Sequence, residues 1–219
     1  MADARRRAAV LISGRGSNLA ALIAASRAKD YPAEIALVVS DNSEAAGLAS
    51  ARDAGIPSAV VTRASFENRA AFEAEIDAAS RLVGIEIVCL SGFMRILSRE
   101  FVEAWRDRML NIHPSLLPLF PGLHTHERAL AAGVRVHGAT VHFVRPEMDT
   151  GPIIVQGAVP VLAADTGETL AARVLKVEHR IYPLALKLVA GGRARVVEER
   201  VVIEGEEREP GASLVVPPI

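Results

Sequence analysis

Short apolar segments alternate with helical patterns through the first half of the chain. Continuous apolar runs, typical of strands buried on both faces of a sheet, occur at residues 8–12, 35–39, 59–61 and 85–90. Apolar residues at helical spacing predict helices at residues 17–27, 43–54 and 67–82, and Ser98 is suited to cap a fourth at 99–105. This order predicts an α/β fold, a Rossmann-like and mostly parallel sheet with helices on both faces.

The second half of the chain has a different pattern. Residues 109–121 contain three prolines, too many for a helix, and predict extended or turning chain. Strands are expected at residues 139–144 and 153–161, around a turn-rich loop. A regular apolar stripe predicts the longest helix at residues 166–189, and one or two edge strands follow at 195–203.

The composition is that of an ordinary globular protein. Half of the 219 residues are apolar and 23% are charged, which excludes disorder and a coiled coil as the main architecture. The formal net charge of −1 argues against a nucleic-acid partner. A single cysteine, Cys89, excludes an internal disulfide and a cysteine-rich zinc site, and it fits a reduced, cytoplasmic setting.

Targeting and membrane signals are weak along the whole chain. The N-terminal apolar run stops after five residues, which is short for a signal peptide. No stretch approaches the roughly 20 apolar residues of a membrane span. We expect a cytoplasmic protein without a membrane partner, forming one domain over residues 1–219 with flexible segments at 1–7 and from about 205 to 219.

A glycine-rich turn joins the first predicted strand to the first predicted helix. It reads Ser13-Gly-Arg-Gly-Ser-Asn18. Free N–H groups at a helix start bind anions, and glycines let a phosphate approach the backbone. The turn lacks the third glycine of a dinucleotide fingerprint and the lysine of a P-loop, so a single phosphate fits it better than a dinucleotide. The alternative is a plain turn in which Ser17 caps the helix.

Asn111 and His113 lie at the start of the proline-rich segment. Pro114 favours an extended conformation for His113. Alternate residues of an extended chain share a face, so Asn111 and His113 are expected to point the same way, with Ile112 turned toward the core. An amide donor beside an imidazole suits the stabilisation of a developing oxyanion. The alternative is a satisfied polar pair in a loop.

Asp149 lies in the turn-rich loop between two predicted strands. Its carboxylate would favour the charged form of a nearby histidine, and the alternative is an ordinary turn residue. His142, on a predicted strand, fits a buried and hydrogen-bonded histidine. Glu178 and His179 lie off the apolar stripe of the long helix, so solvent exposure is expected for both, with Glu178 at a cleft edge as the alternative.

Two further features bear on ligand binding. Residues 92–97 follow a predicted strand at the end where open α/β sheets place ligands, although core packing also explains them. The histidines at 113, 124 and 126 match no metal-binding spacing, and cysteine partners are absent, so we expect no metal site.

Together these segments resemble the phosphoribosylglycinamide formyltransferase family. The matching segments are ISGRGSNL at 12–19, GFMRIL at 92–97, NIHPSLLP at 111–118, PGLHTH at 121–126, HGATVHFV at 137–144 and DTGPI at 149–153. The resemblance runs in order from about residue 8 to residue 191. It implies transfer of the formyl group of 10-formyltetrahydrofolate to the amine of N1-(5-phospho-D-ribosyl)glycinamide, in de novo purine biosynthesis.

The resemblance also implies roles for individual residues. The catalytic group would be Asn111, His113 and Asp149. The ribonucleotide would be held by Gly16, Ser17, Asn18 and Glu178. The folate co-substrate would be bound by Arg69, Met94, Arg95, Ile96, Leu97 and Asn111. No metal takes part, and the resemblance leaves a monomer or a homodimer open. Thr150 stands where the family often has a smaller residue, and the tail after Glu204 matches no family segment.

Other functions remain as alternatives. Methionyl-tRNA formyltransferases carry an added C-terminal domain and a basic surface, and formyltetrahydrofolate deformylases usually carry an added N-terminal domain. A deformylase, whose acceptor is water, would not need a phosphate loop. A non-catalytic nucleotide-binding sensor would not need Asn111, His113 and Asp149 together. A nicotinamide oxidoreductase is disfavoured by the incomplete glycine fingerprint.

Overall fold

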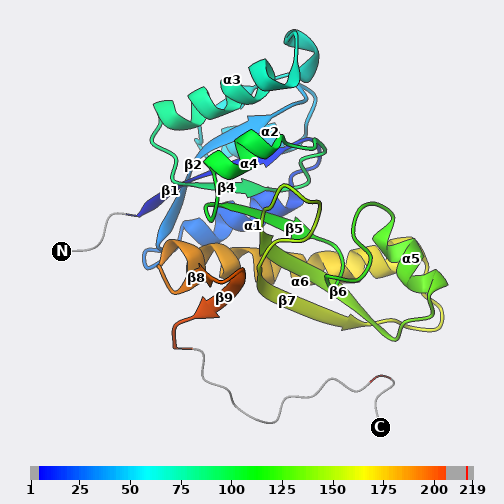
Figure 1. Ribbon diagram of the computed structural model, residues 1–219. Helices are drawn as coiled ribbons and strands as arrows, with labels where there is room; N and C mark the ends of the chain where they lie inside the picture. Colours follow the sequence, from blue (N-terminus) through cyan, green and yellow to red (C-terminus); the bar gives the residue numbers. More distant parts are fainter. Residues whose placement is uncertain (1–4, 206–215, 217–219) are drawn as a thin grey trace.

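A seven-stranded sheet forms the centre of the computed structural model, which describes residues 5–205 and 216 (Figure 1). Its strands stand in the order β3-β2-β1-β4-β5-β6-β7. Neighbours from β3 to β5 pair in parallel, whereas β6 is antiparallel to both β5 and β7. The bounds are β1 Arg6–Ile12, β2 Ala33–Ser40, β3 Ser58–Val60, β4 Ile87–Leu90, β5 Met109–His113, β6 Val136–Phe143 and β7 Ile153–Pro160.

Helices cover both faces of this sheet. They are α1 Ser17–Ser26, α2 Gly47–Asp53, α3 Arg69–Leu82, α4 Arg99–Ala104, α5 Thr125–Ala131 and α6 Gly167–Ala190, with a short 3-10 turn at Arg63–Ser65. Successive residues of β1 serve opposite faces: Val10 packs in the core with α1 and α6, and Leu11 packs with α3 and α4. Strands buried on both faces must be apolar throughout, which confirms the α/β architecture predicted from the continuous apolar runs.

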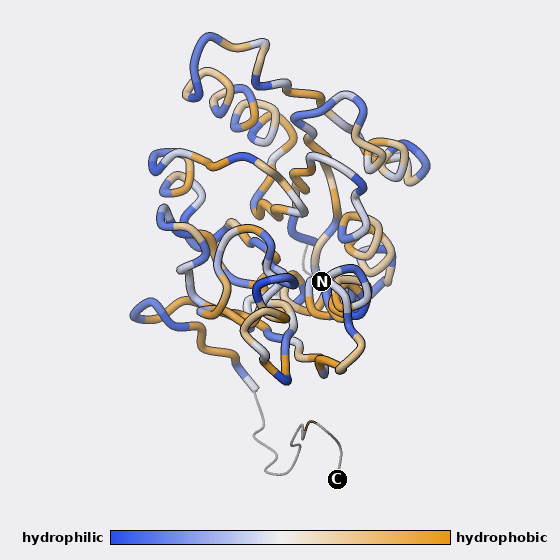
Figure 2. Tube along the Cα trace, turned by 90° about the vertical axis from the view of Figure 1, so that its right-hand side faces the viewer, coloured by the Kyte–Doolittle hydropathy of each residue, from blue (hydrophilic) through white to orange (hydrophobic). Residues whose placement is uncertain are grey.

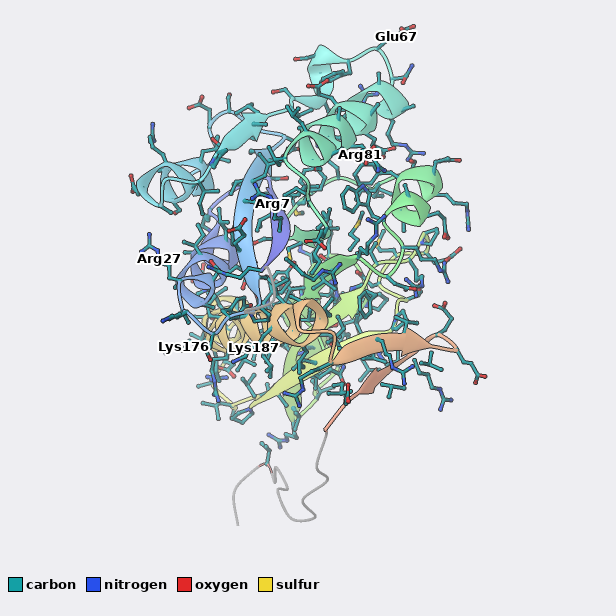
Figure 3. The ribbon with its side chains drawn as sticks, turned by 90° about the vertical axis from the view of Figure 1, so that its left-hand side faces the viewer. Arg7, Arg27, Glu67, Arg81, Lys176 and Lys187 are labelled. Carbon is teal, nitrogen blue, oxygen red and sulfur yellow. The ribbon has the colours of Figure 1, made fainter. Side chains whose placement is uncertain are left out.

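The long helix α6 lies across the second half of the sheet. Thr166 caps it, with Thr169 completing a reciprocal pair of cap hydrogen bonds. Gly157 of β7 lets the helix approach closely, since an added Cβ there would lie 2.1 Å from Val177 Cγ1. Lys176 and Lys187 are exposed on the outer side of α6, as Figure 3 shows. Figure 2 shows apolar, orange stretches mostly through the interior of the molecule and hydrophilic, blue ones mostly at its peripheral turns.

Several predicted boundaries need correction. Arg6 and Arg7, predicted to be flexible, belong to β1, because Arg7 Nη1 pairs with Glu34 at 2.7 Å and Arg6 Nε pairs with Glu86 at 3.2 Å. The helix predicted at 43–54 begins only at Gly47, since the Asn42 side chain accepts a hydrogen bond from the Glu44 amide and holds a turn there. The rest of the two predicted flexible segments lies almost wholly outside the described residues.

The secondary structure between β4 and β6 and after α6 was predicted only in part. The chain at 109–113 was predicted to be extended and forms β5, and the short helix α5 was missed. The predicted edge strands at 195–203 form a hairpin, β8 Ala194–Val197 and β9 Arg200–Ile203, which is a two-stranded sheet of its own.

Candidate active site

The pairing of β5 with β6 sets Asn111 directly opposite His142. Asn111 Nδ2 lies 3.3 Å from His142 Nε2, and His142 Nδ1 lies 2.9 Å from the Phe143 carbonyl oxygen. A carbonyl only accepts, so Nδ1 carries the proton and Nε2 accepts from the Asn111 amide. Burial lowers the pKa of His142 and favours this neutral form. The predicted buried, hydrogen-bonded state of His142 is thereby confirmed.

His113 ends the same strand and turns its ring toward Asp149. His113 Nδ1 lies 3.5 Å from Asp149 Oδ2, and His113 Nε2 lies 2.9 Å from the Phe120 carbonyl oxygen. The imidazole is buried, and both of its nitrogens face oxygen acceptors. The alternation of faces along β5 is as predicted, because Ile112 packs in the core between these two residues.

Asp149 is held by a second loop as well as by its own. It has a left-handed backbone, with φ of 55°, and its Oδ2 atom accepts a hydrogen bond of 2.8 Å from the Gly122 amide. Its Oδ1 atom lies 3.9 Å from His142 Nε2. The carboxylate therefore joins the loop after β5 to the loop between β6 and β7. Asn111 and His113, which the sequence analysis grouped with Asp149, both lie near this carboxylate, Asn111 by way of His142.

The glycine-rich turn lies between β1 and α1. Gly16 has a φ of 72°, and an added Cβ would lie 2.6 Å from Gly47 Cα, so only glycine fits this position. Gly16 itself is the N-cap of α1, and no side chain caps the helix. The alternative in which Ser17 serves as the cap is therefore wrong. Among residues 5–205, the first N–H groups of α1 meet no side-chain acceptor, as an anion site requires.

Asn18 and Glu178 meet beside this turn. Asn18 Nδ2 donates a hydrogen bond of 2.6 Å to Glu178 Oε2, although the residues lie 160 positions apart. Both are buried, and burial raises the pKa of Glu178. The predicted solvent exposure of Glu178 is wrong, because α1 packs against α6 and encloses that side of the helix. Asn18 Oδ1 is buried without a hydrogen-bond partner among the described residues.

Residues 92–97 leave β4 next to the glycine-rich turn. The Met94 amide donates to Ser13 Oγ at 2.9 Å, and Arg95 forms an ion pair with the buried Asp41 at the end of β2. Met94 is 64% exposed and Ile96 is 71% exposed, whereas Leu97 is buried in the core. The loop thus offers two apolar side chains beside the point where the strand order reverses, at which open α/β sheets bind ligands.

Arg69 reaches this loop only indirectly. It begins α3 and lies 3.9 Å from Glu73, whose carboxylate accepts hydrogen bonds from the backbone and hydroxyl of Ser98. Ser98 directly follows residues 92–97 in the chain.

Other contacts of the site were missed by the sequence. The pairing of His142 with Asn111, the acceptor supplied by the Phe120 carbonyl and the donor supplied by the Gly122 amide depend on strand register and loop shape, which no local pattern carries. Within residues 5–205 and 216, no group of three or more His, Cys, Asp or Glu side chains is arranged to hold a metal ion.

A family model described as formyl transferase matches residues 6–186. The chain belongs to this family. The match runs from the first residue of β1 into α6, so it contains the sheet and all the residues of the candidate site.

Relatives agree with this assignment. Phosphoribosylglycinamide formyltransferase of Escherichia coli strain K12 is 44% identical over 201 residues, covering 92% of this chain and 95% of that protein. The trifunctional purine biosynthetic protein adenosine-3 of Bos taurus is 53% identical over 194 residues, which cover 89% of this chain. The chain spans only 19% of the length of that bovine protein.

Solved structures share the fold over most of the chain. Glycinamide ribonucleotide transformylase 1 from Symbiobacterium toebii is 46% identical with a TM-score of 0.88, and the match covers 91% of this chain and 94% of that one. A formyltetrahydrofolate deformylase from Pseudomonas syringae has a TM-score of 0.85 at 26% identity, covering 92% of this chain and 66% of that one. No helix in the described part of this chain has the length and apolar character needed to cross a membrane.

Proposed function

We propose that this chain transfers the formyl group of 10-formyltetrahydrofolate to the amine of N1-(5-phospho-D-ribosyl)glycinamide, in de novo purine biosynthesis. The convergence of Asn111, His113 and Asp149 carries the proposal. His113 Nδ1 lies 3.5 Å from Asp149, and Asn111 is linked to the same carboxylate through His142, whose Nε2 atom lies 3.3 Å from Asn111 Nδ2 and 3.9 Å from Asp149 Oδ1. A 44% identity to the E. coli formyltransferase, over 95% of that enzyme, supports the choice of substrates.

The reaction needs stabilisation of negative charge and movement of one proton. The neutral amine attacks the formyl carbon, and the carbonyl oxygen becomes an oxyanion. One N–H of the Asn111 side chain is directed at His142, and the other remains for that oxygen. His113 supplies the second donor, with Asp149 Oδ2 lying 3.5 Å from its Nδ1 atom. Asp149 receives the proton that the amine loses and returns it to the folate nitrogen as the carbon–nitrogen bond breaks, so that no proton is gained or lost overall.

His113 must change its acceptor before it can act in this way. Its Nε2 atom donates to the Phe120 carbonyl, 2.9 Å away. Phe120 has a left-handed backbone, with φ of 53°, in the turn between β5 and α5. The substrate oxygen would replace this carbonyl, so that the turn moves when the folate binds.

The two substrates would occupy neighbouring parts of the sheet edge. The phosphate of the ribonucleotide would bind at Gly16, Ser17 and Asn18, with Glu178 contacting another part of the same molecule. Met94 and Ile96 would cover the folate ring, with Arg69, Arg95, Leu97 and Asn111 completing its surroundings. The fit is supported by the exposure of these two apolar side chains and by the free N-terminus of α1.

The main alternative is hydrolysis of the same folate by a deformylase. The deformylase from P. syringae is 26% identical, against 46% for the S. toebii transformylase. The buried pairing of Asn18 with Glu178 beside a free helix N-terminus also favours a phosphorylated acceptor over water. A non-catalytic sensor is disfavoured because it has no use for the catalytic group. We further propose a cytoplasmic monomer or homodimer that needs no metal, nucleic acid or membrane.

A two-arm assay tests the proposal. The purified protein is incubated with 10-formyltetrahydrofolate, with and without the ribonucleotide, and tetrahydrofolate and formylated ribonucleotide are both quantified by mass spectrometry. We expect the two products in equal amounts and only when the ribonucleotide is present. Tetrahydrofolate released at the same rate without the ribonucleotide would establish the deformylase. If neither product forms, both enzymatic activities are excluded.

A further inference from the structure

The root of the loop that carries Asp149 holds a buried guanidinium. Arg145 is only 8% exposed, although it lies just after β6 at the start of residues 145–152. Its Nη2 atom lies 2.7 Å from Asp107 Oδ1, and its Nη1 atom donates to the Val144 carbonyl at 3.1 Å. A buried charge is tolerated only when its partners are in place, so this arginine fixes the backbone around it.

The third partner of Arg145 comes from the C-terminal hairpin. Arg145 Nε lies 2.7 Å from Glu199 Oε2, across 54 positions of sequence. The other carboxylate oxygen of Glu199 lies 2.5 Å from Arg106 Nη2. Glu199 stands in the tight turn between β8 and β9, where its φ of 56° is left-handed. Figure 1 shows this hairpin beside β7, and one carboxylate therefore links it to two arginines of the main sheet's loops.

Close packing in the loop at residues 145–152 ties the position of Asp149 to that of Arg145. Its two ends are joined by a hydrogen bond of 2.9 Å from the Phe143 amide to the Pro152 carbonyl. At Gly151 an added Cβ would lie 1.7 Å from the Phe143 oxygen and 3.3 Å from Arg145 Cγ. The loop is therefore packed against the arginine stem with no free space, and Asp149 lies only four residues further along.

We propose that Glu199 is a positioning residue for the Asp149 carboxylate, acting through Arg145. Its effect on turnover rests on the proposed function, whereas its effect on the loop does not. The hairpin lies outside residues 6–186, the part matched by the formyl transferase family model. A segment beyond that match thus completes the support of the catalytic loop. Removing the charge of Glu199 leaves Arg145 with Asp107 as its only carboxylate partner among the described residues and loosens the loop.

The test compares Glu199→Gln with Glu198→Gln in the full chain. The second variant removes one charge from the same turn, and Glu198 is exposed with no ion pair among the described residues. Hydrogen exchange of the substrate-free proteins is followed by mass spectrometry. We expect exchange across residues 145–152 to rise about tenfold in Glu199→Gln and to stay at the wild-type rate in Glu198→Gln.

Kinetics provide the second readout. A displaced catalytic group costs turnover rather than binding, so we expect kcat of Glu199→Gln to fall about tenfold while KM for the ribonucleotide stays within about twofold. Unchanged loop exchange in Glu199→Gln, or an equal rise in both variants, would overturn the inference. Lost ribonucleotide affinity with an unchanged kcat would overturn it too. If the wild-type protein transfers no formyl group, the proposed function fails, and the exchange comparison still decides the role of Glu199 in the loop.

Discussion

Two histidines face the same carboxylate with different hydrogen-bond partners. His142 donates from Nδ1 to the Phe143 carbonyl and accepts from Asn111, which requires a neutral ring. His113 directs both nitrogens at oxygen atoms, those of Asp149 and Phe120. His142 thus orients the Asn111 amide, and His113 is the second donor of the proposed mechanism. Asp149 lies 3.5 Å from His113 Nδ1 and 3.9 Å from His142 Nε2.

Asp149→Asn removes the charge of this side chain and keeps its shape. The asparagine oxygen still accepts from the Gly122 amide, so the loop contact is kept. Without the negative charge, His113 loses the carboxylate that faces its Nδ1 atom, and the proposed pair of donors is weakened. Losing one such donor costs a factor of about 10²–10³ in rate, and we expect kcat to fall by that factor at pH 7.5. Calorimetric titration should show nearly unchanged ribonucleotide affinity.

Glu147→Gln is the matched control for this variant. Glu147 lies in the same loop, but it is exposed and pairs with the exposed Arg99 at 2.8 Å. Exposed pairs contribute little, so kcat should remain within about twofold of the wild type. Turnover of Asp149→Asn at the level of this control would refute the assignment of Asp149.

The orientations of several single residues could be predicted from the sequence, because successive residues of an extended chain point to opposite faces. That alternation placed Asn111 and His113 on one side and Ile112 on the other, as β5 does. It left the partner of Asn111 undetermined, since the pairing with His142 depends on the register between β5 and β6. Glu178 was misplaced for a related reason: a helical pattern does not show which neighbouring helix covers a polar position.

At the scale of elements, Ser98 joins the loop 92–97 to two helices. Its hydroxyl oxygen accepts from the Phe101 amide at the start of α4, as an N-cap does. The same hydroxyl donates to the buried Glu73 of α3, and the Ser98 amide donates to Glu73 at 2.7 Å. One serine therefore satisfies a buried carboxylate and fixes the end of the loop that carries Met94 and Ile96.

Ser98→Ala should destabilise the fold through both contacts. Loss of the cap and of one hydrogen bond to a buried carboxylate together cost about 2 kcal/mol, measured as the change in unfolding free energy in urea. Ser80→Ala is the control, because the Ser80 hydroxyl only donates to the Ile76 carbonyl within α3. We expect at most about 0.5 kcal/mol for that variant. Equal losses would mean that Glu73 finds another donor.

Most elements were predictable because their patterns are long or buried on both sides. The continuous apolar runs that became β1, β2 and β4 needed no knowledge of their partners. The helix α5 was missed because it has only seven residues and begins at Thr125 after an N-cap, His124, that has a left-handed φ of 56° and makes no side-chain cap hydrogen bond. The C-terminal hairpin was predicted as strands, but its contact with Arg145 spans 54 positions and is invisible to local patterns.

At the scale of the whole molecule, buried histidines are concentrated around α5 and β6. Burial lowers the pKa values of His126, His137 and His142, and lowers that of His137 to about 4. The rings of His126 and His137 lie 5.3 Å apart between their centroids, so protonation of either opposes protonation of the other. Acid therefore acts on this half of the molecule by protonating histidines that burial keeps neutral.

The sign of the effect on stability follows from proton linkage. In the unfolded chain a histidine has a pKa of about 6.5, whereas His137 in the folded protein has a pKa of about 4. Between these two pH values the unfolded state binds a proton that the folded state does not, so acid favours unfolding. The contribution of His137 is complete above pH 6.5 and is lost as the pH falls toward 4. At pH 5 the loss amounts to about 2 kcal/mol, or about 5 °C in Tm for a chain of this size. Glu178, whose raised pKa acts in the opposite direction, is common to all the variants compared.

His137→Gln tests this directly, because the amide side chain does not titrate and can donate to the Pro114 backbone carbonyl, the hydrogen-bond partner of His137. We expect it to lower Tm at pH 7.5, since a packed ring is lost, and to reduce the further fall between pH 7.5 and pH 5 by about 5 °C relative to the wild type. The control is His124→Gln, at an exposed position, which should retain the full wild-type fall. Thermal unfolding at pH 7.5, 6 and 5 keeps the comparison above the range in which paired carboxylates titrate. A fall of wild-type size in His137→Gln would show that His137 is not the group that makes the fold sensitive to acid.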